Sequence, residues 1–192
     1  LSLQELPLDA VTRLDAAGAR TLLPGRVLGA GSRATGSGLM ARRRLRRVVA
    51  PSPGRPRQLQ AVLALPGGGH LGLTAVHPLP PLTEQSVRDW QAVLRGLPAA
   101  AEAGRPQVLA GDFNATLDHR ELRRLLDRGY ADAADATGDG LRATFPAGRT
   151  LGAITIDHVL VPATIRVRRV ATHELRGSDH RVLIAELLLP AR

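Results

Sequence analysis

The most informative stretch of the sequence is Leu109-Ala110-Gly111-Asp112-Phe113-Asn114, where an apolar run ends in a carboxylate and a carboxamide. Residues 106–110 are predicted to form a buried strand that runs into this stretch. Asp112 and Asn114 are two residues apart, so an extended backbone would point both side chains to the same side. Together they could take a proton from water and hydrogen-bond a phosphoryl oxygen. The end of this strand is therefore a candidate for chemistry.

Two later motifs also place ionisable groups where an apolar strand meets a loop. They are Asp157-His158, in a strand predicted over residues 153–161, and Asp179-His180, at the start of one predicted over 181–189. A carboxylate in an apolar strand is unfavourable unless it is paired, so Asp157 should have a partner, and His180 is the candidate. A carboxylate that holds one imidazole nitrogen fixes the tautomer for proton transfer. His158 alternates away from Asp157 and is expected to be structural.

The remaining chain contains both strand and helix patterns, and residues 27–77 are rich in strand signals. Strands are predicted at residues 1–6, 58–65 and 71–77, the last two as a hairpin, and helices at residues 8–17, after Thr83 as N-cap, and after an Asp118–Glu121 capping box. Trp90 lies at helical spacing with Leu94 and is predicted to anchor the core. Pro51-Ser52-Pro53-Gly54 is predicted to be a turn, and Thr144-Phe145 is a weaker candidate for lining a cleft.

The composition fits one domain spanning residues 1–192. The chain is 44% hydrophobic, which suffices for a single core, and no stretch approaches the ~20 apolar residues of a membrane span. Cysteine is absent, which excludes disulfides, thiol catalysis and Cys-ligated zinc. A metal site would have to use Asp, Glu, Asn and His, which favours hard cations such as Mg²⁺, Mn²⁺ or Ca²⁺.

The formal net charge is +9, and every basic residue is an arginine. Such a charge favours an anionic partner: nucleic acid, a phospholipid headgroup or a phosphorylated metabolite. A coding bias toward Arg, Ala, Gly and Pro would produce the same total, so the charge supports an anionic substrate without establishing one. The arginine run at residues 42–47 fits an exposed strand edge.

Five stretches spread over nearly the whole chain resemble the endonuclease/exonuclease/phosphatase superfamily, which includes DNase I-like nucleases, abasic-site endonucleases, neutral sphingomyelinases and inositol polyphosphate phosphatases. The stretches are Leu3-Gln4-Glu5, Ala75-Val76-His77-Pro78, Gly111-Asp112-Phe113-Asn114, Ile156-Asp157-His158-Val159 and Gly177-Ser178-Asp179-His180. The resemblance implies a four-layer α/β sandwich of the DNase I-like type, with two mixed β-sheets face to face and helices outside. It also implies a divalent-metal-dependent phosphoester hydrolase.

The resemblance implies a role for each matching residue of the catalytic group. His77 is expected to contact the scissile phosphate, and Asn114 to bind a phosphate oxygen. Asp112 would orient or deprotonate the attacking water. Asp157 would orient His180, and this pair would assist proton transfer or stabilise charge in the transition state.

The resemblance also implies a metal site. Glu5 is expected to bind Mg²⁺ or Mn²⁺, with Asp179 completing the metal environment. Phosphoester cleavage needs a positioned water and neutralisation of charge on the phosphoryl oxygens, and a metal with imidazole and amide donors supplies both.

The chain departs from the family pattern at its start. Family members begin with an additional strand that carries an Asn near the metal, followed by a helix, and nothing before Leu1 corresponds to these. The chain is therefore expected to lack the N-terminal strand, either as a fragment of a longer protein or as a degenerate copy. The second possibility leads to an alternative function: a catalytically weak phosphate- or nucleic-acid-binding domain that has lost part of the metal site.

The substrate class stays open between nucleic acid, phospholipid and lipid pyrophosphate. Basic loops beside the cleft would favour a nuclease, and apolar loops with an upstream membrane segment would favour a lipid hydrolase. Residues 77–81 and 109–119 resemble actinobacterial membrane-linked members, whose transmembrane helices precede an exported catalytic domain. The location is accordingly open between extracytoplasmic and cytoplasmic. The chain itself is expected to be a monomer without a protein partner.

Overall fold

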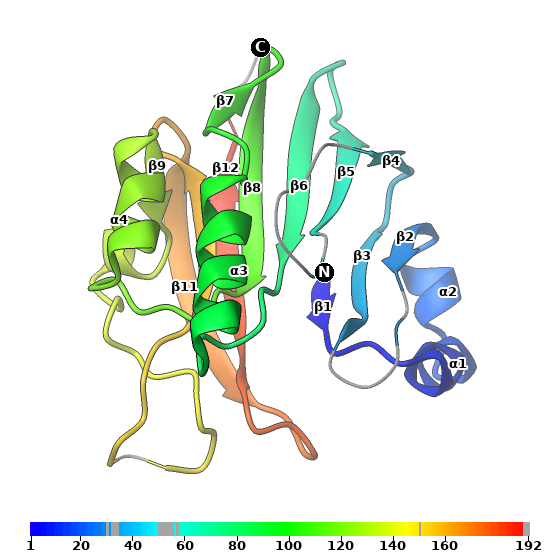
Figure 1. Ribbon diagram of the computed structural model, residues 1–192. Coiled ribbons are helices and arrows are strands. Elements are labelled where there is room, and N and C mark those ends of the chain that lie inside the picture. Colours follow the sequence, from blue (N-terminus) through cyan, green and yellow to red (C-terminus); the bar gives the residue numbers. More distant parts are fainter. Residues whose placement is uncertain (30, 32–34, 50–55, 57, 150, 190–192) are drawn as a thin grey trace.

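A mixed seven-stranded β-sheet organises the computed structural model, which describes residues 1–29, 31, 35–49, 56, 58–149 and 151–189 (Figure 1). The strands are β4 (Leu45–Val48), β5 (Leu59–Ala64), β6 (His70–Val76), β7 (Ala101–Glu102), β8 (Arg105–Asp112), β9 (Tyr130–Asp132) and β10 (Asp157–Pro162). Their order is β4-β5-β6-β8-β10-β9, with β7 beside β8. The pairing of β6 with β8 is parallel and the other pairings are antiparallel.

The predicted hairpin is confirmed as β5 and β6, which pair antiparallel with Leu59 opposite Ala75. The strand predicted over residues 153–161 begins later, at Asp157, because Ile154 instead forms a bridge with Phe145. The turn predicted at residues 51–54 lies outside the described residues.

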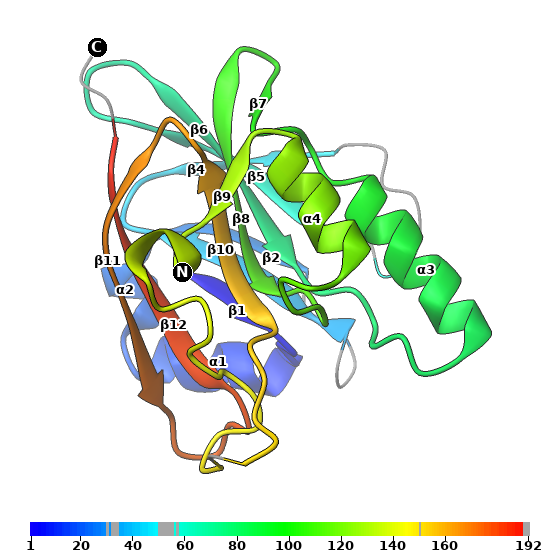
Figure 2. The same ribbon diagram turned by 90° about the vertical axis from the view of Figure 1, so that its left-hand side faces the viewer.

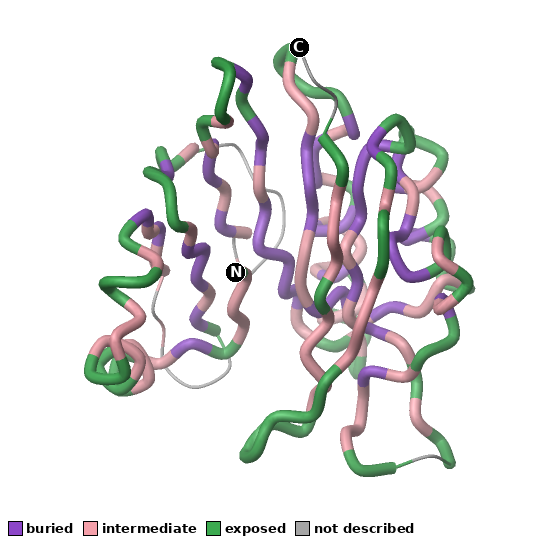
Figure 3. The backbone as a smooth tube through the Cα atoms, turned by 180° about the vertical axis from the view of Figure 1, so that it is seen from behind, coloured by how far each residue is buried: buried purple, intermediate pink, exposed green. Residues whose placement is uncertain are grey.

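Two helices, α3 (Glu84–Arg95) and α4 (Arg120–Asp127), cover one face of this sheet (Figures 1 and 2). Thr83 caps α3 as predicted: its hydroxyl accepts a hydrogen bond from the Ser86 amide. Trp90 is 5% exposed and packs with Leu94 and Leu122 in the core between helices and sheet. Because the helices pack on the sheet, most residues of its middle strands are buried from solvent (Figure 3).

The capping box predicted from Asp118 and Glu121 is wrong. Helix α4 begins at Arg120, its N-cap is His119, and no side chain caps it. Glu121 is buried and forms ion pairs with Arg95 at 2.8 Å and Arg124 at 2.9 Å. These guanidinium groups hold the pKa of the Glu121 carboxyl below its ordinary value. The carboxylate is thus used between helices instead of at a helix end.

Two small antiparallel sheets cover the other face. They consist of β1 (Ser2–Gln4), β3 (Ser37–Ala41) and β2 (Gly25–Gly29) on one side, and of β11 (Arg166–Glu174) and β12 (Arg181–Leu188) on the other. Helices α1 (Leu8–Ala16) and α2 (Ala19–Leu22) lie beyond β2 and β3 (Figure 1). The predicted α/β sandwich is confirmed, although the second sheet layer is antiparallel and divided instead of mixed and continuous. No helix in the described part of the chain has the length and apolar character needed to cross a membrane.

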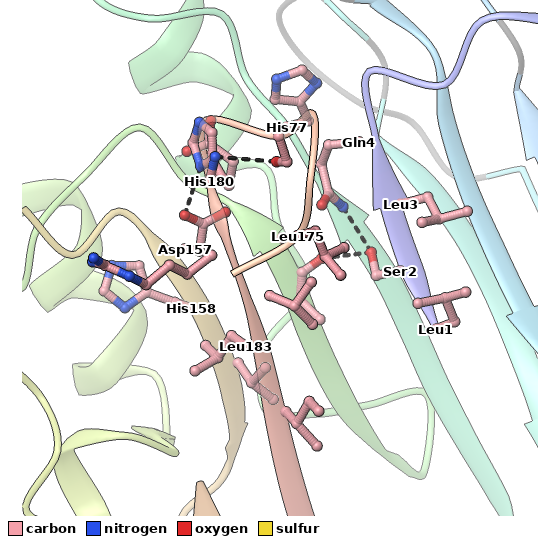
Figure 4. A pocket seen from close by; sticks show the side chains of 18 of the residues that line it. Leu1, Ser2, Leu3, Gln4, His77, Asp157, His158, Leu175, His180 and Leu183 are labelled. Carbon is pink, nitrogen blue, oxygen red and sulfur yellow. Dashed lines mark hydrogen bonds and ion pairs between the residues drawn. The ribbon is translucent and has the colours of Figure 1, made fainter. Parts of the chain in front are cut away.

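A groove of about 610 Å³ lies between the two small sheets. Strands β1 and β12 form its walls (Figure 4), and β8 and β10 contribute Ala110 and Val159 to its lining. Its lining is largely apolar along the strands, with Leu3 on one wall and Leu183 on the other. The groove is also lined by most of the residues singled out by the sequence motifs, namely Glu5, His77, Asp112, Asp157, Asp179 and His180.

Candidate active site

Three motif residues meet at one edge of the seven-stranded sheet. Asp112 is the last residue of β8, and Asp157 is the first residue of β10, directly opposite Asp112 in the strand register. His77 follows β6, whose Val76 lies beside Gly111 of β8. Strand order thus brings together residues that are 35 to 80 positions apart in the chain.

Asp112 and Asn114 meet through a turn and not through an extended strand, which corrects the sequence-based geometry. Asn114 has a left-handed backbone (φ 46°), which Asn tolerates better than most residues. Its amide N–H donates to Asp112 Oδ1 at 2.7 Å, and its Nδ2 donates to Asp112 Oδ2 at 3.3 Å and to the Pro78 carbonyl at 3.0 Å. Gly111 is required before them, since a Cβ there would lie 2.1 Å from the Val76 carbonyl oxygen.

The structure brings Asp157 and His180 into direct contact. His180 Nδ1 lies 2.8 Å from Asp157 Oδ2, and the side chains are 28% and 14% exposed (Figure 4). The Thr144 hydroxyl accepts the Asp157 amide at 3.1 Å and so fixes the start of β10. The Phe145 ring lies against the imidazole, with 4.7 Å between ring centroids. The pair therefore sits in a defined position at the groove.

Burial and neighbouring charges shift three pKa values at this site. Burial, reinforced by the Asp157 carboxylate opposite, raises the pKa of Asp112 to about 7. Burial alone would lower the pKa of His180, but its hydrogen bond to Asp157 and the charge of that carboxylate leave it above the ordinary value. Burial lowers the pKa of His77, which favours the neutral imidazole.

His77 and Glu5 lie at the mouth of the groove. His77 is 5% exposed, and Gln58 Oε1 accepts its backbone N–H at 2.5 Å. Its Nε2 lies 4.0 Å from Glu5 Oε1, whereas its buried Nδ1 has no hydrogen-bond partner among the described residues. Glu5 follows β1 in a left-handed conformation (φ 50°), and its side chain is 64% exposed.

The predicted metal ligands line the same groove without forming a closed cage. Glu5 and Asp179 are both exposed there. Within the described ranges, no group of three or more His, Cys, Asp or Glu side chains could hold a metal ion. Mg²⁺ commonly keeps several waters and binds through one or two carboxylates plus substrate phosphate. The donor set fits that mode of binding.

Sequence reasoning missed two supporting residues, Gln58 and Asp132. Gln58 holds the His77 backbone, and Asp132 holds His158, with 2.8 Å between Asp132 Oδ2 and His158 Nδ1. Neither residue stands in a recognisable motif, so no local signal marks them. His158 was expected to be structural, and it is 1% exposed.

The fold and this group of residues define a class of protein. A family model described as "Endonuclease/Exonuclease/phosphatase family" matches residues 1–180, and the chain belongs to that family. Its members are enzymes that hydrolyse phosphoester bonds, typically with a divalent metal. A search of curated proteins found no match for the chain.

Solved structures share the fold at low sequence identity. An endonuclease/exonuclease/phosphatase from Beutenbergia cavernae is 22% identical with a TM-score of 0.70, over 93% of this chain and 57% of its own. A 3′ phosphatase from Neisseria bound to a product DNA hairpin is 20% identical (TM-score 0.69; 98% and 88% covered). TDP2 of D. rerio, complexed with a single-stranded DNA product, is 18% identical (TM-score 0.68; 98% and 85% covered). This chain thus spans little more than half of the first of these proteins.

Proposed function

We propose that this chain hydrolyses phosphoester bonds of nucleic acid at the mouth of the groove. One observation carries the proposal: the Asp157–His180 hydrogen bond of 2.8 Å stands beside Asp112, directly opposite Asp157 in the sheet. The groove is therefore lined by the Asp112 carboxyl, by the His180 imidazole held by Asp157, and by the His77 imidazole. Together these groups can activate a water molecule and stabilise charge on a phosphoryl group.

Asp112 is the proposed base. Its pKa of about 7 matches the range in which a general base works best at neutral pH. Asn114 holds this carboxyl in place with its backbone amide. We expect a bound phosphate oxygen to take over the longer of the Asn114 amide contacts, the 3.3 Å one to Asp112.

His180 is the proposed donor to the phosphoryl or leaving-group oxygen. Nδ1 is engaged with Asp157, while Nε2 has no hydrogen-bond partner in the part of the chain that the structure describes. The raised pKa favours the imidazolium, which carries a hydrogen on Nε2. His77, kept neutral by burial, would contact a second phosphate oxygen.

Glu5 and Asp179 would hold Mg²⁺ or Mn²⁺. When bound, such an ion neutralises charge on the phosphoryl oxygens. The exposed Glu5 side chain can turn toward a cation, since the only ionic contact it makes among the described residues is the 4.0 Å one to His77.

Two exposed arginines beside the site favour nucleic acid as the substrate. Arg149 and Arg176 lie on two loops that are linked by a hydrogen bond, in which the Ala147 amide donates to the Asp179 carbonyl oxygen at 2.6 Å. Neither guanidinium has an ion-pair partner within the described ranges, so both are available to phosphates. The arginine run near β4 lies at the other end of the sheet and does not contribute. The DNA-bound Neisseria and D. rerio structures support this choice of substrate.

The test is hydrolysis, with Mg²⁺, of a DNA hairpin carrying a 3′ phosphate and of single-stranded DNA. Vesicles containing a lipid pyrophosphate are assayed in parallel. We expect turnover of DNA. The salt dependence of this turnover should be weaker in Arg149→Ala/Arg176→Ala than in wild type, and unchanged in the matched control Arg42→Ala/Arg44→Ala. Turnover of the vesicles alone would identify a lipid hydrolase. DNA binding without any turnover would support the alternative of a weak binding domain.

A further inference from the structure

A second Asp–His pair lies behind the first, and the proposed chemistry does not use it. His158 Nδ1 is 2.8 Å from Asp132 Oδ2, and the two side chains are 1% and 2% exposed. His158 follows Asp157 on β10, so the two side chains point to opposite sides of the sheet (Figure 4). The second pair thus faces the helix-covered core, away from the groove.

Every polar side-chain atom of this pair has a hydrogen-bond partner within the protein. His158 Nε2 lies 2.8 Å from the Ala115 carbonyl oxygen, and Asp132 Oδ1 accepts the Asp135 amide at 2.9 Å. A carbonyl can only accept, so Nε2 carries a hydrogen and donates it. Buried and fully hydrogen-bonded networks of this kind hold one conformation.

The network ends on the loop that directly follows the proposed base, Asp112. Ala115 follows Asn114, whose left-handed backbone and amide contacts position the Asp112 carboxyl. The same loop is held at Phe113, whose carbonyl accepts the Trp90 indole N–H at 2.9 Å and whose ring packs edge-on against His158. His158 is the side chain that ties Ala115 to β10 and β9.

We propose that Asp132 and His158 are positioning residues: through the Ala115 carbonyl they hold Asp112 and Asn114 in their working geometry. The inference rests on the proposed function for its activity readout. Holding reacting groups in place contributes strongly to rate, and a displacement of about 1 Å can cost ~10²-fold. Loss of the His158 donor therefore lowers kcat more than it raises KM.

Three variants differ in which hydrogen bonds they remove and which they keep. His158→Phe keeps a ring but removes both ring nitrogens, leaving the Ala115 carbonyl and Asp132 Oδ2 without their partners. Asp132→Asn is the conservative variant: its NH₂ can donate to Nδ1 of a neutral imidazole while its oxygen still accepts the Asp135 amide, so Nε2 keeps its bond to Ala115. Tyr130→Phe is the matched control, because it removes a buried side chain–backbone hydrogen bond, Tyr130 to the Pro98 carbonyl, at the far end of the strand.

Two measurements test the proposal: kcat and KM for an activated phosphodiester with Mg²⁺, and NMR hydrogen exchange of the Asn114 amide. We expect His158→Phe to lower kcat by ~10²-fold and speed Asn114 exchange. Asp132→Asn should stay within a few-fold of wild type, and Tyr130→Phe should lower the melting temperature with kcat and Asn114 exchange unchanged.

An Asn114 amide that exchanges equally slowly in wild type and His158→Phe would overturn the proposal. So would a kcat loss in Tyr130→Phe as large as that in His158→Phe. If wild type shows no turnover, the proposed function fails, while the exchange measurement still decides the positioning role. If His158→Phe does not fold, His158→Gln is measured instead: its amide NH₂ can still donate to the Ala115 carbonyl, so kcat and Asn114 exchange should stay close to wild type, and a ~10²-fold loss of kcat with Asn114 exchange unchanged would overturn the proposal.

Discussion

The two Asp–His pairs have the same 2.8 Å contact between Nδ1 and a carboxylate oxygen, yet their surroundings differ. Asp157–His180 opens onto the groove, with side chains 14% and 28% exposed, whereas Asp132–His158 is enclosed. The difference lies at Nε2. In His158 it is bound to the Ala115 carbonyl, and in His180 it finds no partner among the described residues. A free second nitrogen is what makes such a pair available for chemistry.

One strand supplies half of each pair. Asp157 and His158 are neighbours on β10, and alternation sends one side chain to the groove and the other to the core. A change in the backbone of β10 would therefore disturb both pairs, whereas a change of one side chain alters only the pair that contains it.

The largest expected effect is on turnover, and it should come from Asp157 and His180, the more exposed of the two pairs. His180→Ala and Asp157→Asn should each lower kcat by ~10²–10⁴-fold, because a general acid–base group is lost or held in the wrong tautomer. The double variant should be little worse than His180→Ala alone, since members of one catalytic unit are not additive. The assay is hydrolysis of an activated phosphodiester with Mg²⁺, with circular dichroism as a control for folding. Additive losses, or normal activity of Asp157→Asn, would show that the pair is structural.

The next effect is on stability and should fall on the enclosed pair. Asp132→Ala leaves Nδ1 of His158 buried without its hydrogen-bond partner, and an unsatisfied buried polar group costs about 1–3 kcal/mol in the free energy of unfolding. Asp157→Ala should cost only about 1 kcal/mol, because water can reach His180. Urea denaturation of both variants measures the contrast. Equal losses would remove the distinction between the pairs.

The motifs predicted which side chains come together at the groove far better than they predicted their geometry. Asp112 and Asp157 converge because strand order places β8 beside β10, and the contact with Asp157 adds His180. The apolar runs predicted the strands but not which of them pair. The left-handed turn at Asn114 could not be predicted from spacing, since it depends on contacts to Pro78, from a different loop.

Long-range partners explain the other differences. The pattern at residues 118–121 resembles a capping box, yet Glu121 is drawn inward by Arg95, which comes from another helix. Strand β11, with exposed Arg166 and Arg168, escaped prediction because its outward residues outnumber its apolar ones. Asp132 carries no motif because its function depends on a histidine 26 residues later.

A smaller effect concerns the cation, which should act only on the exposed side. Glu5→Gln should weaken Mn²⁺ binding by at least ~10-fold, because a carboxylate facing the groove is lost. Glu84→Gln is the matched control, since Glu84 is an exposed glutamate at the start of α3. Titration calorimetry measures both. Equal affinity in wild type and Glu5→Gln would remove Glu5 from the metal site.

The smallest effect is the pH response of His180. The Asp157 carboxylate keeps the pKa of His180 above its ordinary value against the opposing effect of burial. Replacing that carboxylate in Asp157→Asn leaves only the charges of Asp112 and Asp179 to oppose burial, so the His180 pKa should fall. Because the folded pKa exceeds the unfolded one, the wild-type pair's contribution is complete below the unfolded pKa of ~6.5 and is lost as pH rises through the folded pKa.

With both side chains partly exposed, that contribution should amount to less than about 1 kcal/mol. NMR titration of the imidazole C–H signal gives the pKa, and unfolding measured on either side of neutrality gives the stability change. Asp132→Asn provides the comparison, because it alters the enclosed pair and leaves the carboxylate beside His180 in place. If Asp157→Asn left the His180 pKa unchanged, the Asp157 carboxylate would not stabilise the imidazolium across the 2.8 Å contact. His180 would then be hydrogen-bonded to Asp157 without the raised pKa on which its proposed role as a proton donor depends.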